Sequence, residues 1–284
     1  MLIAETKTKI LYNAADASWK AHDQVVCNVI LYDTHVVVTV FDITGQRFVS
    51  LYAAETDNNK RFELLESHLS SIDPLISKRN LFLSVPKTML IPAALYDKEN
   101  RKSFLENQHK IDPGETIGDF PVKMIEAQMA YLYPDSIKSL KEKSLLANAS
   151  LIPIDAAWLD VLTLTHKNND REHIHINISD GFISIAVFKA GGLQFYNTFE
   201  TATPEEVLYF VMFVSEQLHV NPHKDSYYYS GFILKTDETF NLLSKYIKIL
   251  KPEERPAIYN YSMPVLDIPR YMLFNVFCTP VCES

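Results

Sequence analysis

The 284-residue sequence is short of glycine and cysteine and has no long apolar run. Its three cysteines, Cys27, Cys278 and Cys282, do not form an even set, which argues against a disulfide framework and for a reducing environment. No stretch of about 18 uncharged apolar residues occurs, so the sequence predicts no membrane-spanning helix. Residues 1–16 also lack an apolar run of signal-peptide length. We therefore expect a cytoplasmic protein.

Positive charge is scarce as well. The chain has 27 Lys and Arg against 35 Asp and Glu, a net charge of −8. Surfaces for nucleic acid or anionic membranes concentrate Lys and Arg, so both partners are disfavoured. With only 7 glycines but 47% hydrophobic residues, the sequence predicts a packed globular protein of about two domains at ~150 residues each.

Residues 173–200 predict an antiparallel meander of three strands. Isoleucines at 174, 176 and 178 alternate with polar residues, and this period of two is that of a strand. Ser179-Asp180-Gly181 is typical of a tight hairpin because glycine readily takes a positive φ. A second alternating run follows, and Gly191-Gly192 marks the hairpin before the third strand.

The next segment predicts a helix and a fourth strand. Thr203 and Glu206 form a capping box around Pro204, and the helix runs to about Leu218. Because this helix is apolar on nearly every side, we expect it to pack between the sheet and a second domain, with a partner-binding surface as the alternative. The strand at 227–233 follows a helical crossover, which predicts parallel pairing with a meander strand.

The first half of the chain repeats this pattern. Shifting residues 25–55 by 147 positions, the distance from Asp33 to Asp180, superposes the strands and turns without a gap. The superposed pairs include Val36 with Ile183, Gly45 with Gly192, Phe48 with Phe195, Tyr52 with Phe199 and, further on, Ser84 with Gly231. A helix over about 58–71, capped by Asp57, lies between them. We infer an α/β protein with mixed sheets and two duplicated domains, each a three-strand meander plus helix-strand-helix.

We place an irregular lead-in at 1–20, the first domain at 21–165, a polar linker at 166–172, and the second domain at 173–284 with a proline-rich tail. The remaining expected elements are a helix over 97–109, a loop over 111–119, a strand over 122–127, a helix over 134–143, an extended segment over 149–152, a helix over 152–164 and a closing helix over 270–277.

This duplicated unit resembles the actin/Hsp70/sugar-kinase superfamily, in which two ribonuclease H-like domains clamp a nucleotide. The stretch MIEAQMAYLYPDSIKSLKEKSLLANASLIPIDAAWLDVL, followed by the hairpin NISDGFISIAVFKAGGLQFYN, resembles the PilM kind of actin-like protein in pilus assembly.

The chain also resembles a family of Bacteroidetes proteins with a domain of unknown function. The segments YNTFE, TPEEVLYFVMF and EQL and the IPRYMLFNVF ending carry this resemblance. It spans about residues 20–284 and implies a fold more strongly than an activity.

The superfamily resemblance implies where a nucleotide would bind. In that superfamily two Asp-x-Gly hairpins present N–H groups to phosphates, Asp helps to hold Mg²⁺ through water, and a Gly-Gly pair packs against adenosine. The matching residues here are Asp33, Asp180 with Gly181, and Gly231. The first hairpin, Asp33-Thr34-His35, has no glycine, the second is shortened, and only one glycine remains on the adenosine side. The competing interpretation is ordinary turn residues. We assign no cofactor; ATP and Mg²⁺ are the candidates.

No other constellation predicts catalysis or metal binding. Cys278 and Cys282 lack a second ligand pair with zinc spacing. His173 and His175 share a strand face with Asn177, which we expect to be solvated or to face another domain, with a metal site as the alternative. Capping and solvation account for Asp155 and Asp160. Nucleophile-elbow, phosphate-loop and dinucleotide-binding motifs are absent.

The sequence favours a non-catalytic actin-like scaffold or assembly protein that binds other proteins and has a degenerate nucleotide site. The reason is that phosphoryl transfer depends on the electrostatic stabilisation that phosphate loops supply. The alternative is a nucleotide-binding protein with slow ATPase or phosphotransferase activity, and a small-molecule sensor is a third option. The sequence does not identify the protein partner and leaves a homo-oligomer open.

Overall fold

The structure, a computed structural model, describes residues 8–16, 19–21, 24–56, 60–72, 76, 78–169 and 171–283, except for the side chains of Lys143 and Glu283. Asp57, the expected helix cap, lies outside them. The chain divides into two compact units, the first made of residues 1–84, 134–152 and 257–269, and the second of 85–133, 153–256 and 270–284. The linker at 166–172 lies inside the second unit. The extents of the two duplicated domains remain a prediction.

The first unit is built on a mixed sheet in the order β1-β4-β3-β2-β5-β9, with β15 paired to β4. Its strands are β1 (Lys9–Ala15), β2 (Val25–Leu31), β3 (His35–Asp42), β4 (Arg47–Glu55), β5 (Lys78–Leu83), β9 (Ser150–Pro153) and β15 (Asn260–Tyr261). Its helices are η1 (Trp19–Ala21), α1 (Arg61–Ile72), α3 (Asp135–Lys143) and α7 (Met263–Leu266). The expectation of an irregular lead-in was wrong for residues 9–15, because they pair antiparallel with β4.

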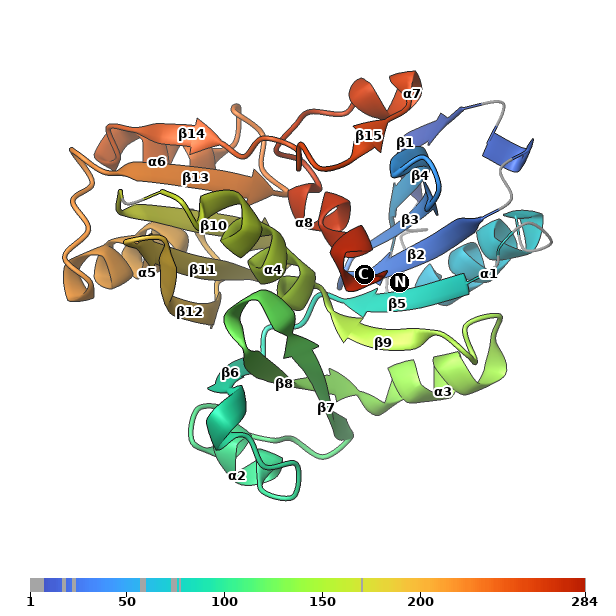
Figure 1. Ribbon diagram of the computed structural model, residues 1–284, viewed down its shortest axis with the longest axis horizontal. Helices are drawn as coiled ribbons and strands as arrows, with labels where there is room; N and C mark the ends of the chain where they lie inside the picture. The colour runs from blue at the N-terminus through green and yellow to red at the C-terminus, as the bar shows by residue number, and fades with distance from the viewer. Residues whose placement is uncertain are drawn as a thin grey trace, which may run out of the picture. The chain divides into compact units, whose positions relative to one another are not determined.

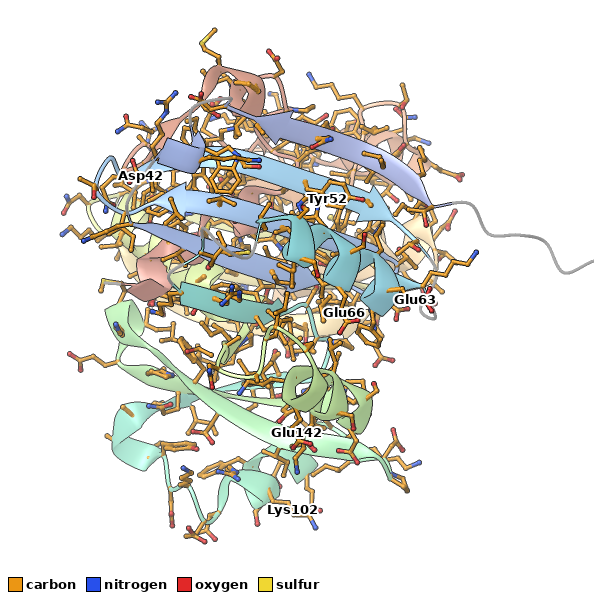
Figure 2. The ribbon with its side chains drawn as sticks, turned by 90° about the vertical axis from the view of Figure 1, so that its right-hand side faces the viewer. Asp42, Tyr52, Glu63, Glu66, Lys102 and Glu142 are labelled. Carbon is orange, nitrogen blue, oxygen red and sulfur yellow. The ribbon has the colours of Figure 1, made fainter. Side chains whose placement is uncertain are left out.

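Helix α1 crosses the first sheet with its apolar side inward (Figure 2). Leu65 and Leu69 are buried, whereas Glu63 and Glu66 lie on the outer, exposed side. The ring of Tyr52 on β4 stacks on His68 of the helix, with centroids 4.1 Å apart. This helix therefore occupies the place that the repeat predicted between the third and fourth strands of the unit.

The second unit contains a five-stranded sheet in the order β12-β11-β10-β13-β14 and a three-stranded sheet in the order β6-β8-β7. The strands are β6 (Thr88–Pro92), β7 (Glu115–Val122), β8 (Ala127–Pro134), β10 (His173–Ser179), β11 (Phe182–Lys189), β12 (Gly192–Glu200), β13 (Ser226–Gly231) and β14 (Leu250–Pro252). The helices are η3 (Ala93–Leu95), α2 (Arg101–Glu106), η4 (Lys123–Ile125), α4 (Ile154–His166), α5 (Pro204–Gln217), α6 (Glu238–Tyr246), α8 (Phe274–Phe277) and η5 (Thr279–Glu283).

Two short segments of this unit differ from expectation. The predicted strand over 122–127 was wrong, since 123–125 form the turn η4 and the strand β8 begins at Ala127. The predicted loop over 111–119 already contains the start of β7. Both errors arise because a small antiparallel sheet depends on pairing between distant residues more than on local composition.

The strand registers support the internal repeat and correct its details. Leu31 pairs with Val36, and Ile178 pairs with Ile183, which is the expected shift of 147 positions. β2 pairs parallel with β5, as β10 does with β13. The third strands of the two meanders, β4 and β12, are offset by two residues from the gapless superposition. Val40 pairs with Ser50, but the equivalent Val187 pairs with Phe195, two residues before the position that the shift of 147 predicts. The cause is the second hairpin, which has four residues between Asp42 and Arg47 but two between Lys189 and Gly192.

The superpositions of Gly45 on Gly192, Phe48 on Phe195 and Tyr52 on Phe199 were therefore wrong by two positions. The superposition of Ser84 on Gly231 was wrong by one position. Leu83 pairs with Leu31 in the first sheet, and Gly231 pairs with the equivalent Ile178 in the second, so Leu83 is the residue that matches Gly231. A slip of two keeps each side chain on its own face, which is why the alternating pattern conceals it.

Strand β10 is central in its sheet and is buried along its whole length. Its isoleucines pack with residues of α5 and α6 in one apolar cluster. Figure 1 shows α5 and α6 on the side of this sheet away from α4. Its polar side lies under α4, where the His166 ring is 4.4 Å from the His173 ring and 4.7 Å from the His175 ring, centroid to centroid. The expectation that His173 and His175 line a solvated or interdomain face was thus wrong, because a helix of the same unit covers them.

The capping box of α5 is present: the Thr203 hydroxyl accepts the backbone N–H of Glu206, and the Glu206 carboxylate accepts the N–H of Thr203. The helix buries one side against the sheet, through Val207, Val211 and Val214. Tyr209 and Phe213 are 61% and 44% exposed. The prediction that α5 is covered on more than one side was wrong. In the described part of the chain, no helix has the length and apolarity needed to cross a membrane.

Asp155 and Asp160 in α4 are both buried, so solvation does not account for them. Asp160 accepts backbone N–H groups of Lys123 and Met124 and so fixes the turn η4. Asp155 Oδ2 accepts the hydroxyls of Ser184, at 2.5 Å, and Tyr196, at 2.7 Å.

The Asp155 cluster ties the two sheets of the second unit together. The Tyr196 hydroxyl lies 2.9 Å from that of Thr88 on β6, and the Thr198 hydroxyl donates to the carbonyl of Pro86. Burial raises the pKa of Asp155 above its usual 3.8, although the two hydroxyl donors oppose the shift. Burial thus disfavours the charged form of this carboxyl, and the two hydroxyl donors favour it.

We predict that Asp155→Ala lowers the free energy of unfolding by about 2–3 kcal/mol at pH 7, because two buried hydroxyls lose their acceptor. Asp155→Asn keeps an accepting oxygen and costs less. Since the folded-state pKa is raised, the stability of the wild type relative to Asp155→Asn is greatest at low pH and falls as the pH rises through that pKa. Urea denaturation between pH 4 and pH 8 measures this difference, and a difference that grows with pH would contradict the assignment.

Candidate functional site

The second hairpin is the best-preserved part of the expected nucleotide site. Ser179 pairs with Phe182, so Asp180 and Gly181 form a two-residue turn between β10 and β11. Gly181 has a φ of +75°, and a Cβ added to it would meet nothing within 4 Å. Its carbonyl accepts the N–H of Thr201, at 2.9 Å. The turn thus keeps an open glycine beside a carboxylate.

Gly231 lies at the same end of the sheet, opposite Ile178 in the parallel ladder. Its φ is +98°, and an added Cβ would overlap the carbonyl oxygen of Ile178 and lie 2.8 Å from that residue's N and C atoms. Its N–H donates to the carbonyl of Tyr271, at 3.1 Å. Close packing of β13 on β10 alone therefore requires glycine at this position.

A buried polar chain that the sequence did not single out supports this end of the sheet. The Ser230 hydroxyl lies 3.1 Å from Asn177 Oδ1, and Asn177 Nδ2 lies 3.5 Å from the Ser179 hydroxyl. All three residues are buried. The polar positions of β10 were visible in the sequence, but their partner on β13 became apparent only from the parallel register.

The first hairpin, in the other unit, differs in chemistry. The Tyr32 N–H donates to the His35 carbonyl, at 3.0 Å. Asp33 and Thr34 form the turn between these two residues. None of the residues 32–35 has a positive φ. Buried Arg61 on α1 donates to the carbonyls of Tyr32 and Asp33. This turn therefore presents carbonyl oxygens to a guanidinium.

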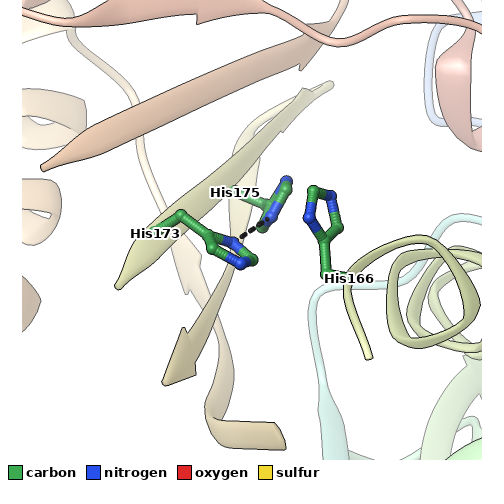
Figure 3. A group of neighbouring side chains, drawn as sticks. All are labelled: His166, His173 and His175. Carbon is green, nitrogen blue, oxygen red and sulfur yellow. Dashed lines mark hydrogen bonds between the residues drawn. The ribbon is translucent and has the colours of Figure 1, made fainter. Parts of the chain in front are cut away.

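The structure thus brings Asp180, Gly181 and Gly231 to one end of one sheet, and places Asp33 at the matching end of β2. The resemblance implies that the Asp180 carboxylate could hold Mg²⁺ through water. A different group of side chains has the spacing of metal ligands. It lies at the opposite end of β10, where His166, His173 and His175 meet (Figure 3).

Solved structures define the class of protein. A Bacteroides thetaiotaomicron protein with an actin-like ATPase fold and unknown function is similar to this chain with a TM-score of 0.73 and 16% identity, over 84% of this chain and 94% of that one. The PilM–PilN type IV pilus biogenesis complex matches with a TM-score of 0.60 and 9% identity, over 91% of this chain and 98% of that one. The chain has the actin-like ATPase fold with two ribonuclease H-like halves, which confirms the predicted fold.

The family is narrower than the fold. Residues 29–250 match the family described as Protein of unknown function (DUF3822), and the chain belongs to that family. This also confirms the expected membership of a family with a domain of unknown function. No curated protein matches the sequence.

The two site glycines allow a matched test of packing. We predict that Gly231→Ala lowers the free energy of unfolding by about 3 kcal/mol or more, since both the positive φ and the overlap with Ile178 oppose a Cβ. Gly181→Ala should cost only about 1–2 kcal/mol, because the positive φ alone opposes it. Chemical denaturation of the two variants measures the difference, and equal losses would contradict the packing role of Gly231.

Proposed function

We propose that this chain is a non-catalytic actin-like assembly protein that acts by binding another protein, and that Asp33, Asp180, Gly181 and Gly231 are the remains of a nucleotide site. The cytoplasm is the proposed location. The observation that carries the proposal is the Asp33-Thr34 turn, which has no glycine and whose carbonyls accept from Arg61. A loop that binds phosphate needs the opposite polarity, with N–H groups toward the anion.

The contact surface that we assign to the partner is the exposed side of α5. Tyr209 and Phe213 stack there with ring centroids 6.1 Å apart, and the exposed Glu205, Glu206 and Glu216 flank them. Aromatic side chains on a surface commonly anchor protein interfaces. The partner that fits is a protein with an apolar patch bordered by Lys or Arg. The similar fold in a PilM–PilN complex is consistent with a role in binding protein.

A specific observation favours a second candidate, a nucleotide-binding protein with slow ATPase or phosphotransferase activity. The Asp180-Gly181 turn keeps the Asp-Gly pair, and the space around Gly181 is open. One intact hairpin could still contact a phosphate through its N–H groups.

We predict that Mg·ATP at millimolar concentration does not raise the melting temperature beyond the effect of Mg²⁺ alone, and that no ATP is hydrolysed. A nucleotide bound only by the folded chain would add about 2.7 kcal/mol of stability at a hundredfold excess over Kd. Thermal melts of the wild type and Asp180→Ala measure nucleotide binding, and a phosphate-release assay measures ATP hydrolysis. A shift that Asp180→Ala abolishes would refute the non-catalytic proposal and support the second candidate.

We also predict that replacing Tyr209 and Phe213 together by Ser removes the bound partner without unfolding the chain, because surface substitutions usually change stability by less than about 0.5 kcal/mol. The measurement is quantitative mass spectrometry of proteins that co-purify with the tagged chain. Leu95→Ser, at another exposed apolar residue, is the matched control. The expected result is a loss of at least about tenfold for one protein in the double variant alone. Identical sets from all three chains would contradict the α5 surface.

A further inference from the structure

Three histidines from two elements converge at the amino end of β10 (Figure 3). His173 and His175 lie on the strand, and His166 lies in the last turn of α4. One ring nitrogen of each can be chosen so that all lie within 4.8 Å of one another. His173 Nδ1 and His175 Nε2 are 2.8 Å apart. Zinc–nitrogen bonds of about 2.0–2.1 Å put two ligands of a tetrahedral ion about 3.3 Å apart, so the His173–His175 pair is already close and the third nitrogen must approach by up to about 1.5 Å.

The rings are oriented as metal ligands usually are. His175 Nδ1 is hydrogen-bonded to the Glu253 carboxyl, from a segment 78 residues later. A carboxylate that accepts one ring N–H leaves the other nitrogen free to bind a metal, and most ligating histidines are held in this way. Tyr228 stacks on His175 with centroids 5.0 Å apart, and Phe188 stacks on His173 at 5.4 Å. The ring planes are therefore fixed by packing.

A hydrogen-bonded chain without metal explains only part of the cluster. His173 Nδ1–H can donate to His175 Nε2, and His175 Nδ1–H to Glu253, but His173 Nε2 is then buried with no hydrogen-bond partner among the described residues. Within that same part of the chain, no hydrogen bond from the His166 ring is found either. A metal bound by His173 Nδ1 and His175 Nε2 would leave His173 Nε2 without a partner as well. The feature that the hydrogen-bonded chain leaves unexplained, and that a metal would engage, is therefore the His166 ring.

The cluster has a route to solvent. A pocket of about 610 Å³ within the second unit is lined by His173 and Tyr228. Arg171, Lys224 and Lys251 also line it. Glu172 and Asp225 line it too, so a cation that enters through this pocket meets side chains of both charges.

We propose that His166, His173 and His175 form a site for a divalent transition metal, zinc being the ion that suits three imidazoles best, with Glu253 positioning His175. The site is independent of the proposed partner binding and lies at the opposite end of β10 from the Asp180 turn.

The test is zinc binding by the full chain, purified without a polyhistidine tag and stripped with chelator. Isothermal titration should show one zinc per chain. His166→Asn, His173→Asn and His175→Asn should each weaken binding by at least about 100-fold, and Glu253→Gln by about 10–100-fold. His223→Asn, at an exposed histidine of the same unit, is the matched control and should bind as the wild type does.

Two further readouts separate this site from adventitious binding. Excess zinc should raise the melting temperature of the wild type and of His223→Asn by about 5 °C, but not that of His166→Asn. Cobalt(II) in place of zinc should give the strong visible absorption of a four-coordinate, nitrogen-ligated ion. Because His166 is half-buried, its replacement is the variant best able to fold. The absence of saturable zinc binding, or undiminished binding by His166→Asn, would overturn the proposal.

Discussion

The second unit depends on one constraint: β10 is a central strand with polar side chains on one face, and both faces are buried. Isoleucines on one side pack against α5 and α6, and this apolar contact does not depend on the direction of any hydrogen bond. On the other side every polar group must find a partner inside the protein, because leaving it unpaired costs about 1–3 kcal/mol. His175 reaches Glu253, and Asn177 reaches Ser230 on the next strand. The partners come from β13 and the segment after β14, and α4 covers the same face through His166.

This constraint divides the strand into two chemically different ends. At its carboxyl end the Asn177 chain and the close approach of Gly231 to Ile178 rigidify the hairpin that carries Asp180. At its amino end imidazoles gather under α4 beside a charged pocket. The carboxyl end is where the actin-like fold suggests a nucleotide, yet Gly231 there is fully explained by packing. The amino end holds donor atoms that packing leaves partly unexplained.

The two copies of the repeated strand pattern differ in their turns more than in their strands. The first hairpins superpose residue for residue, so Thr34 stands where Gly181 stands, and Arg61 supplies a guanidinium to the carbonyls of the turn that lacks glycine. The second hairpins differ by two residues in length. Since strand pairing tolerates a slip of two without changing faces, the sheets keep the same order while the loops vary.

The sequence by itself determined the meander strands, the hairpin at Asp180, the capping box at Thr203 and the parallel crossover, since period-two alternation, turn glycines and caps are local signals. It also carried a resemblance sufficient for the fold. It did not determine what covers a polar strand face, which side of α5 stays exposed, or that His166 and Glu253 meet His175. Those features depend on contacts between residues far apart in the chain, which no local pattern specifies. Only the tertiary structure therefore showed that His173 and His175, which alternate like surface residues, belong to a buried cluster.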